Sequence, residues 1–322
     1  MLTTWWMKKF LSIGVLIIGV FMNTTGQQDP QNSQFMFNKL IYNPGYAGNS
    51  GGICAGASAR QQWVGFEGAP STTVFYADAA VNPFNIPGGV GLSISNDKLG
   101  FEKNLSIYAT YAYHLDIGKG TLGIGISAGF FNKALDPSWK IPTDDYHTPP
   151  SGDPLIPENK ESFIAFDMNL GLYYSSESFY LGISSTHLLQ PEFKYNKETQ
   201  FSYMARHYYV MGGYNLKLPN PIFEILPSFF LQSDGKATQV TINTNLLYNK
   251  KIWGGVSYRT GDAMIVLVGL QLINGLRLGY SYDFPTSDIR KNSGGTHEIM
   301  IKYCFNISME HVPKHYKSIR FL

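Results

Sequence analysis

Alternation of apolar and polar residues runs through almost the whole chain after residue 26, and it constrains the fold more than any other feature. In the stretch EIMIKYCFNIS (298–308) every second residue is large and apolar: Ile299, Ile301, Tyr303, Phe305 and Ile307. A period of two is typical of a strand with one apolar and one polar face. In a soluble sandwich the apolar face packs into a core. In an outer-membrane barrel it faces lipid, and the polar face lines the lumen.

Fourteen such runs are predicted as strands, an even number, as in single-chain bacterial barrels. They lie at about 51–63, 71–82, 88–96, 103–116, 120–133, 162–175, 178–187, 205–217, 223–232, 237–248, 251–260, 263–273, 275–284 and 296–308. No helical periodicity is evident after residue 26.

The lengths of the connections distinguish the two alternatives. Connections after even-numbered strands are short, for example IGK, SE, NK and NG, whereas three that follow odd-numbered strands are long: 134–161, 188–204 and 285–296. Outer-membrane barrels have short periplasmic turns and long external loops. The sequence therefore predicts an all-β fold, a transmembrane antiparallel up-and-down barrel of about 14 strands over residues 51–308, with the apolar face of 298–308 toward lipid.

The first 26 residues have the pattern of an export signal. Lys8 and Lys9 precede a short apolar run, residues 10–22, which is followed by a small polar stretch ending at Gly26. A spanning helix needs about 20 apolar residues, so this segment is predicted to be a cleaved signal peptide. We expect residues 27–50 to form an N-terminal periplasmic segment and residues 309–322 a periplasmic C-terminal tail. The expected location is the outer membrane of a Gram-negative bacterium.

Composition agrees with this interpretation and excludes a nucleic-acid partner. Without residues 1–26 the chain has 23 basic and 23 acidic residues, so no net charge attracts a polyanion. Charged residues make up only 15% of the chain and aromatic residues another 15%. Few charges and many aromatic residues suit a surface that contacts lipid.

The polar faces of the strands are predicted to line the lumen. They carry charges of both signs: Arg60, Asp78, Arg259, Arg277, Asp283, Glu298 and Lys302. One interpretation is a selective pore or substrate path. The other is a network of opposite charges that neutralise one another in a narrow interior. Mixed signs and large side chains favour the network. Alternation also places bulky aromatic residues inside: Tyr76, Tyr108, Phe131 and Trp253.

No catalytic, cofactor or metal site is predicted, and the chain is not expected to be an enzyme. The motifs G-x-S-x-G, P-loop and helix-opening G-x-G-x-x-G do not occur. The segment HVPKH (311–315) contains a proline between its histidines, and TDDYH (143–147) lacks the spacing of a calcium loop.

The two cysteines, Cys54 and Cys304, lie near the same end of the first and last predicted strands, which are neighbours in a closed barrel. Both are expected to point inward, where they either form a disulfide across the closing seam or simply fill crowded space. The tail mixes basic and aromatic residues, and it is interpreted either as a partner-docking segment or as a disordered end. The tail residues concerned are Lys314, Tyr316, Lys317, Arg320 and Phe321.

Several blocks of the sequence resemble the PorP/SprF family of type IX secretion system outer-membrane proteins. They are QQDPQNSQFMFNKLIYNPGYAG (27–48), RQQWVGFEGAPSTTVFYAD (60–78), GVGLSISNDKLG (89–100), WGGVSYRTGDA (253–263) and LGYSYDFPTSDIRKNSGGTHEIMI (278–301). The blocks occur in the family's order and cover most of the chain. Two departures are Lys39-Leu40-Ile41 in the first block and GTHEI in place of the usual GSHEI.

The resemblance implies a non-enzymatic component of the secretion machinery of Bacteroidetes-type bacteria, without cofactors. Its implied partners are outer-membrane lipid, periplasmic ring components of the machine and a secreted adhesin-type substrate. It implies a role in secretion or surface attachment of large adhesins, and in some members gliding motility. The alternative function, which rests on the barrel alone, is a channel or transporter for a small or apolar solute.

Overall fold

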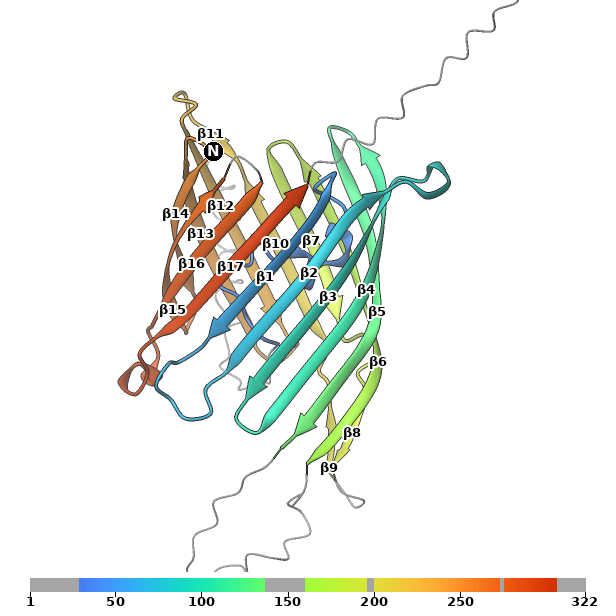
Figure 1. Cartoon of the computed structure of the whole chain (residues 1–322), viewed down its shortest axis with the longest axis vertical. Coiled ribbons are helices and arrows are strands. Elements are labelled where there is room, and N and C mark those ends of the chain that lie inside the picture. Colours follow the sequence, from blue (N-terminus) through green and yellow to red (C-terminus); the bar gives the residue numbers. More distant parts are fainter. Residues whose placement is uncertain (1–28, 137–159, 196–199, 273–274, 306–322) are drawn as a thin grey trace, which may run out of the picture.

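The computed structural model describes residues 29–136, 160–195, 200–272 and 275–305. One antiparallel sheet closes into a barrel (Figure 1). Its strands are β1 (Ile53–Gln61), β2 (Ser71–Val81), β3 (Gly88–Leu99), β4 (Glu102–Ile117), β5 (Gly120–Leu135), β6 (Glu161–Ser176), β7 (Phe179–Thr186), β10 (His207–Tyr214), β12 (Phe223–Ser233), β13 (Thr238–Tyr248), β14 (Ile252–Arg259), β15 (Ala263–Gln271), β16 (Leu276–Pro285) and β17 (Thr296–Phe305).

The ring closes where its first and last strands pair, and each other strand of the ring pairs with the strands before and after it. β1 pairs with β2 on one side and β17 on the other, and β10 pairs with both β7 and β12. The two-residue β11 (Leu216–Lys217) pairs with β12 alone, so the ring itself has 14 strands. The predicted barrel and its strand positions are confirmed. A separate hairpin, β8 (Glu192–Tyr195) with β9 (Gln200–Tyr203), lies between β7 and β10.

Burial alternates along the strands in the predicted sense. On β17 the side chains of Ile299 and Ile301 are 61% and 45% exposed, whereas Glu298 and Met300 are fully buried. An apolar face outside and a polar face inside is the arrangement of a barrel in lipid. No helix among the described residues is long and apolar enough to cross a membrane.

The two ends of the barrel differ in the length of their connections. At one end, here called the short-turn end, β4 and β5 are joined by residues 118–119, β6 and β7 by 177–178, and β13 and β14 by 249–251. Residues 286–295, with the 3-10 helix η3 (Asp288–Lys291), join β16 to β17 at the opposite, long-loop end. Short turns face the periplasm in bacterial barrels. The start of β1 and the end of β17 both lie at the short-turn end, because Ile53 pairs with Phe305.

Residues 29–50 lie inside the barrel, and we call them the plug; in Figure 1 its blue trace passes behind β1 and β2. It contains the short helix α2 (Lys39–Tyr42) and the 3-10 turn η1 (Pro44–Tyr46). Its apolar side chains form one core with the inward face of the wall, comprising Phe35, Leu40, Tyr42, Tyr46, Ala47, Val74, Tyr76, Ala112, Tyr173, Tyr209, Met211 and Phe230. The barrel therefore encloses a packed interior.

The plug differs from the expected periplasmic segment at 27–50. Its apolar side chains would be exposed to water in an extended tether, and burying one such side chain contributes about 1.5–3 kcal/mol. Phe35 and Leu40 are 1% and 2% exposed inside the lumen. Asp29, Ser33 and Asn43 of the plug form hydrogen bonds with groups of the wall, which offsets the cost of burying their polar atoms.

Glycines of β5 leave room for the plug backbone. A Cβ atom on Gly123 would lie 2.0 Å from the carbonyl oxygen of Gly45, and one on Gly125 would lie 2.2 Å from the carbonyl carbon of Pro44. The 3-10 turn of the plug therefore rests directly on the backbone of the wall. The glycine-rich stretch 123–129 relieves crowding inside the barrel at these two positions.

Candidate functional site

A buried charged network joins the plug to the wall near the long-loop end. Arg60 of β1 forms ion pairs with Asp283 of β16 at 2.8 Å and Glu298 of β17 at 3.2 Å. Arg259 of β14 pairs with the same Asp283 at 3.1 Å and with Asp262 at 3.0 Å. Four of the seven predicted lumenal charges thus come together, and opposite charges neutralise one another as buried ions require.

The centre of this network is a serine of the plug. The hydroxyl of Ser33 donates to the carboxylate of Asp283 at 2.8 Å and accepts from Arg60 and Arg259 at 2.7 and 3.0 Å. Glu298 accepts the backbone N–H of Ser33 at 2.6 Å and that of Gln34 at 3.0 Å. The strand charges therefore form a clamp on the plug, and the sequence patterns did not indicate Ser33 or Gln34 as partners.

The other three predicted charges lie away from the clamp. Asp78 accepts the backbone N–H of Gly48 at 3.0 Å. Lys302 places its Nζ 3.4 Å from the hydroxyl of Tyr46. Arg277 lines a cavity at the short-turn end, together with Lys302. The seven predicted lumenal charges thus form two groups at different depths in the lumen.

A lysine of the plug is held by tyrosines. The ammonium of Lys39 donates to the hydroxyl of Tyr173 at 2.9 Å and lies 3.4 Å from the ring centroid of Tyr180. Aromatic rings attract cations through their negative faces. Lys39 was noticed in the sequence only as a departure from the family pattern, and the structure gives it a specific place in the lumen.

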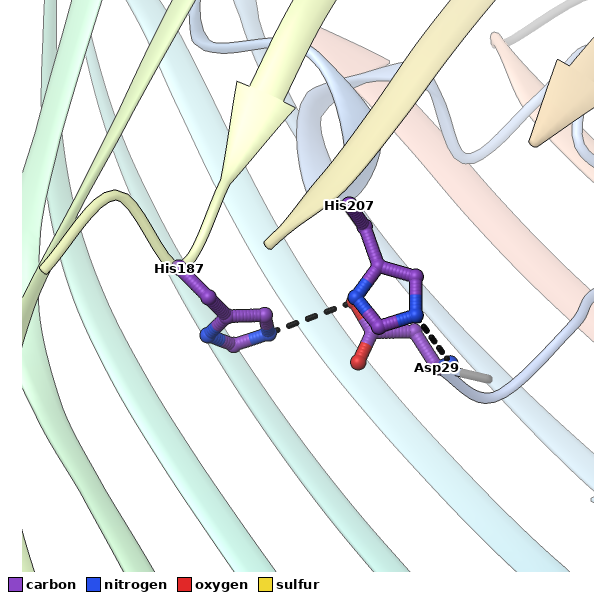
Figure 2. A group of neighbouring side chains, drawn as sticks. All are labelled: Asp29, His187 and His207. Carbon is purple, nitrogen blue, oxygen red and sulfur yellow. Dashed lines mark hydrogen bonds and ion pairs between the residues drawn. The ribbon is translucent and has the colours of Figure 1, made fainter. Parts of the chain in front are cut away.

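The start of the plug is anchored by two histidines (Figure 2). His187 follows the last residue of β7, and His207 is the first residue of β10. His187 bonds Asp29 through Nε2 at 3.2 Å and Asp167 of β6 through Nδ1 at 2.6 Å. Tyr209 also donates to the Asp29 carboxylate, at 2.8 Å. Asp29 is therefore fixed against β6, β7 and β10.

The two histidines of the anchor have different partners, and those of His187 define its protonation state. Both nitrogens of His187 face carboxylates, which only accept, so His187 is a cation. Burial alone would lower the pKa of His187, but Asp29 and Asp167 outweigh it and raise the pKa to about 10. His207 contacts the carbonyl of Ala205 through Nδ1 at 3.0 Å and accepts the backbone N–H of Asp29 at Nε2 at 3.1 Å.

The same three residues are the one candidate metal cluster in the described part of the chain. The ligand atoms of Asp29, His187 and His207 lie within 4.8 Å of one another. A metal bound at Nε2 of His207 would displace the hydrogen bond that this nitrogen accepts from Asp29. A metal at Nε2 of His187 would require loss of its proton. The hydrogen bonds already satisfy the cluster, and it acts as an anchor for the plug.

A cavity of about 140 Å³ adjoins this anchor. Its wall includes Asp29, Tyr42, Tyr108 and the two anchoring histidines. The histidines bond carboxylates and backbone groups, so they are not arranged as a base beside a hydroxyl nucleophile. The predicted interior aromatic residues Tyr76, Tyr108, Phe131 and Trp253 are all buried.

Cys54 and Cys304 form a disulfide across the seam between β1 and β17. They are directly opposite in the register, with Cα atoms 4.1 Å apart. The bond joins residues 250 positions apart in sequence and links the first and last strands of the ring. The tail residues Lys314, Tyr316, Lys317, Arg320 and Phe321 lie outside the described residues, as do the expected signal peptide and the segments 143–147 and 311–315.

Comparison with known proteins gave one family. The model for "Type IX secretion system membrane protein PorP/SprF" matches residues 24–303. No curated protein matched the chain.

Solved structures similar to the chain have low sequence identity to it. A Pseudomonas aeruginosa FadL homologue has a TM-score of 0.46 and 10% identity, covering 86% of this chain and 95% of that one. The Ralstonia pickettii toluene transporter TbuX has a TM-score of 0.45 and 13% identity, covering 87% and 95%. The Acinetobacter baumannii outer membrane protein Omp33 has a TM-score of 0.44 and 9% identity, covering 79% and 98%.

Proposed function

The chain belongs to the PorP/SprF family of type IX secretion system membrane proteins, and from that premise we propose a non-enzymatic role in handling large adhesin-type proteins. The chain is an outer-membrane barrel and a component of the secretion system. The proposed role is to support the secretion of such adhesins or their attachment to the cell surface, in contact with periplasmic ring components. Gliding motility would follow where the attached adhesin moves on the surface.

The observation that carries this proposal is the clamped plug. The Glu298 carboxylate accepts two backbone N–H groups of the plug, and both arginines of the clamp bond the Ser33 hydroxyl. At the other contact, Asp29 bonds the cation His187. A large polypeptide could pass through the lumen only if these buried contacts broke together. The geometry therefore favours a barrel that acts through its loops and periplasmic end as a docking platform.

The second candidate function is a channel for a small or apolar solute. The cavity of about 140 Å³ beside the anchor favours it, because it provides lumenal space large enough for a few atoms. A solute would still have to pass the plug to cross the barrel.

Purification of an affinity-tagged chain from its native host tests the two functions. The docking role predicts that periplasmic ring components and the adhesin co-purify, and that deleting the gene removes the adhesin from the cell surface. The channel predicts steady ohmic conductance of the purified barrel in planar bilayers, with normal adhesin display after deletion. Conductance together with intact display would contradict the docking role.

A further inference from the structure

Two cations face each other inside the barrel at its short-turn end. Arg277 of β16 is directly opposite Lys302 of β17 in the register. Opposite residues of an antiparallel pair share a face, and Lys302 is 5% exposed in the lumen. Like charges in this position are destabilising. A nearby anion is therefore needed to offset the repulsion.

The neighbouring strands supply no acid opposite either cation. On its other side Arg277 is opposite Gln271, and Lys302 is opposite Gly56. The same two strands behave differently at the long-loop end, where Glu298 of β17 lies opposite Arg60 of β1. The charges of the clamp are thus neutralised by other wall residues, whereas no wall residue opposite Arg277 or Lys302 neutralises their charges.

A lysine of the plug lies near these two cations. Burial lowers the pKa of Lys39 well below its ordinary value, and the charges of Lys302 and Arg277 lower it further. The contacts of Lys39 are with tyrosine hydroxyls and rings. Asp78 interacts electrostatically with Lys302; its Oδ2 accepts the backbone N–H of Gly48, and its Oδ1 has no hydrogen-bond partner among the described residues. The two wall cations are therefore set against one carboxylate, and Lys39 supplies no acid to balance them.

Arg277 and Lys302 line an open cavity of about 840 Å³. Lys250 and Lys251, in the turn between β13 and β14, add two more cations to its wall. No acidic residue is found among the described residues of the lining, which are Tyr46, Ser50, Asn249, Lys250, Lys251, Gln271, Leu272, Gly275, Arg277, Lys302, Tyr303, Cys304 and Phe305. The surrounding sequence has no Asp or Glu at 235–261, 263–282 or 299–309.

We propose that this cavity binds carboxylate groups of an acidic polypeptide segment presented from the periplasm. The four lining cations are spread from the lumen to the rim, which suits several carboxylates along a chain better than one compact ion. The cavity volume lies in the range of pockets that enclose a ligand of several side chains. Tyr46, Tyr303 and Phe305 offer apolar wall for the stems of those side chains.

The chain's own C-terminal tail is a poor occupant because of its charge. Residues 306–322 carry Lys314, Lys317 and Arg320 against a single acid, Glu310. An acidic partner segment has the charge that complements the cavity. This inference rests on the proposed function only for the source of the segment, since binding is a property of the cavity itself.

The test uses the purified full-length barrel in detergent and a fluorescein-labelled oligoglutamate peptide, followed by fluorescence anisotropy. We expect saturable binding that weakens as salt rises, because the contacts are ionic. Arg277→Gln and the pair Lys250→Gln with Lys251→Gln should each weaken binding about tenfold, as loss of charge-assisted contacts predicts. Lys119→Gln, in the β4–β5 turn at the same end, removes the same charge from outside the cavity and should leave affinity unchanged.

A second measurement separates loss of the site from loss of the fold. Arg277→Gln relieves the repulsion with Lys302, so without peptide it should raise the melting temperature while weakening peptide binding. Equal binding by wild type and Arg277→Gln, or equal weakening by Lys119→Gln, would overturn the proposal. Full displacement of the peptide by inorganic phosphate at equal concentration would also overturn it, in favour of a small-anion site. None of these outcomes depends on co-purification or adhesin display, so failure here leaves the proposed function standing.

Discussion

The carboxylate of Glu298 on β17 accepts the backbone N–H of Ser33 in the plug at 2.6 Å, within a clamp shared with Arg60. Removing it in Glu298→Ala leaves Arg60 with one carboxylate partner fewer and two backbone donors unpaired. Breaking a buried ion pair from one side costs about 3–5 kcal/mol. We expect the plug to loosen while the hydrogen-bonded ring stays closed. Limited proteolysis of residues 29–50 and conductance in planar bilayers should both increase.

Glu177→Ala is the matched control for this change. Glu177 pairs with Lys217 at 2.6 Å on the exposed surface of the short-turn end. Exposed pairs contribute about 0–1 kcal/mol, so proteolysis and conductance should remain at the wild-type level. A plug equally protected in both variants would show that the clamp does not hold it.

The disulfide at the seam gives a second prediction. Non-reducing mass spectrometry should find Cys54 and Cys304 joined and no free thiol. Cys54→Ser together with Cys304→Ser should lower the free energy of unfolding by about 2–5 kcal/mol, since the bond restricts the unfolded chain. Heat-dependent mobility on gels reports this loss, and a reducing agent should reproduce it in the wild type. If reduction leaves the wild-type transition unchanged, the bond contributes no stability.

The anchor at Asp29 predicts a pH dependence. The pKa of His187, just beyond the end of β7, is raised to about 10 because Asp29 and Asp167 outweigh the effect of burial. A raised pKa in the folded state gives stability that is fully present below the unfolded value, about 6.5, and is lost as pH rises through about 10. Protection of residues 29–50 from proteolysis should therefore decline between pH 8 and 11.

His187→Gln should abolish this pH dependence, since the variant has no charge to lose. His297→Gln is the control: His297 bonds only the exposed hydroxyl of Tyr280 among the contacts described, and its replacement should leave the profile unchanged. Burial would raise the pKa of Asp29, but the neighbouring His187 and His207 lower it overall. The contribution of Asp29 is accordingly lost only as pH falls below its ordinary range. A wild-type profile flat across pH 8–11 would contradict the imidazolium assigned to His187.

The wall of the barrel could be predicted from the sequence because its signals are local. Alternation identifies each strand, and the three long connections that follow odd-numbered strands indicate which end of the barrel carries the long loops. The adjacency of the first and last strands placed Cys54 and Cys304 on the same face at similar depth, but their exact register, and hence the bond, could not be predicted. Arg60 and Glu298 were placed on the lumenal face by the same alternation, before their register was known.

The plug could not be predicted in this way, because its contacts have no period. Asp29 meets His207 at a separation of 178 residues, and Ser33 meets Glu298 at 265. One signal was available. Residues 35–42 include Phe35, Leu40 and Tyr42, which is more apolar surface than a segment in water would carry. A hydrophobic segment before the first strand of a barrel is expected to be buried inside the barrel.

The last prediction concerns the close approach of plug and wall at Gly125. A Cβ atom there would lie 2.2 Å from the carbonyl carbon of Pro44 and 2.3 Å from the nitrogen of Gly45. Both are backbone atoms, so no side-chain rotation relieves the clash in Gly125→Ala, and overpacking costs about 1–3 kcal/mol. The plug should shift while β5 keeps its pairing. Gly254→Ala is the control, because its nearest atom would be the oxygen of Leu267 at an ordinary 3.5 Å. Proteolysis of residues 29–50 should increase in the first variant alone, and equal protection in both would mean that the plug does not rest on β5.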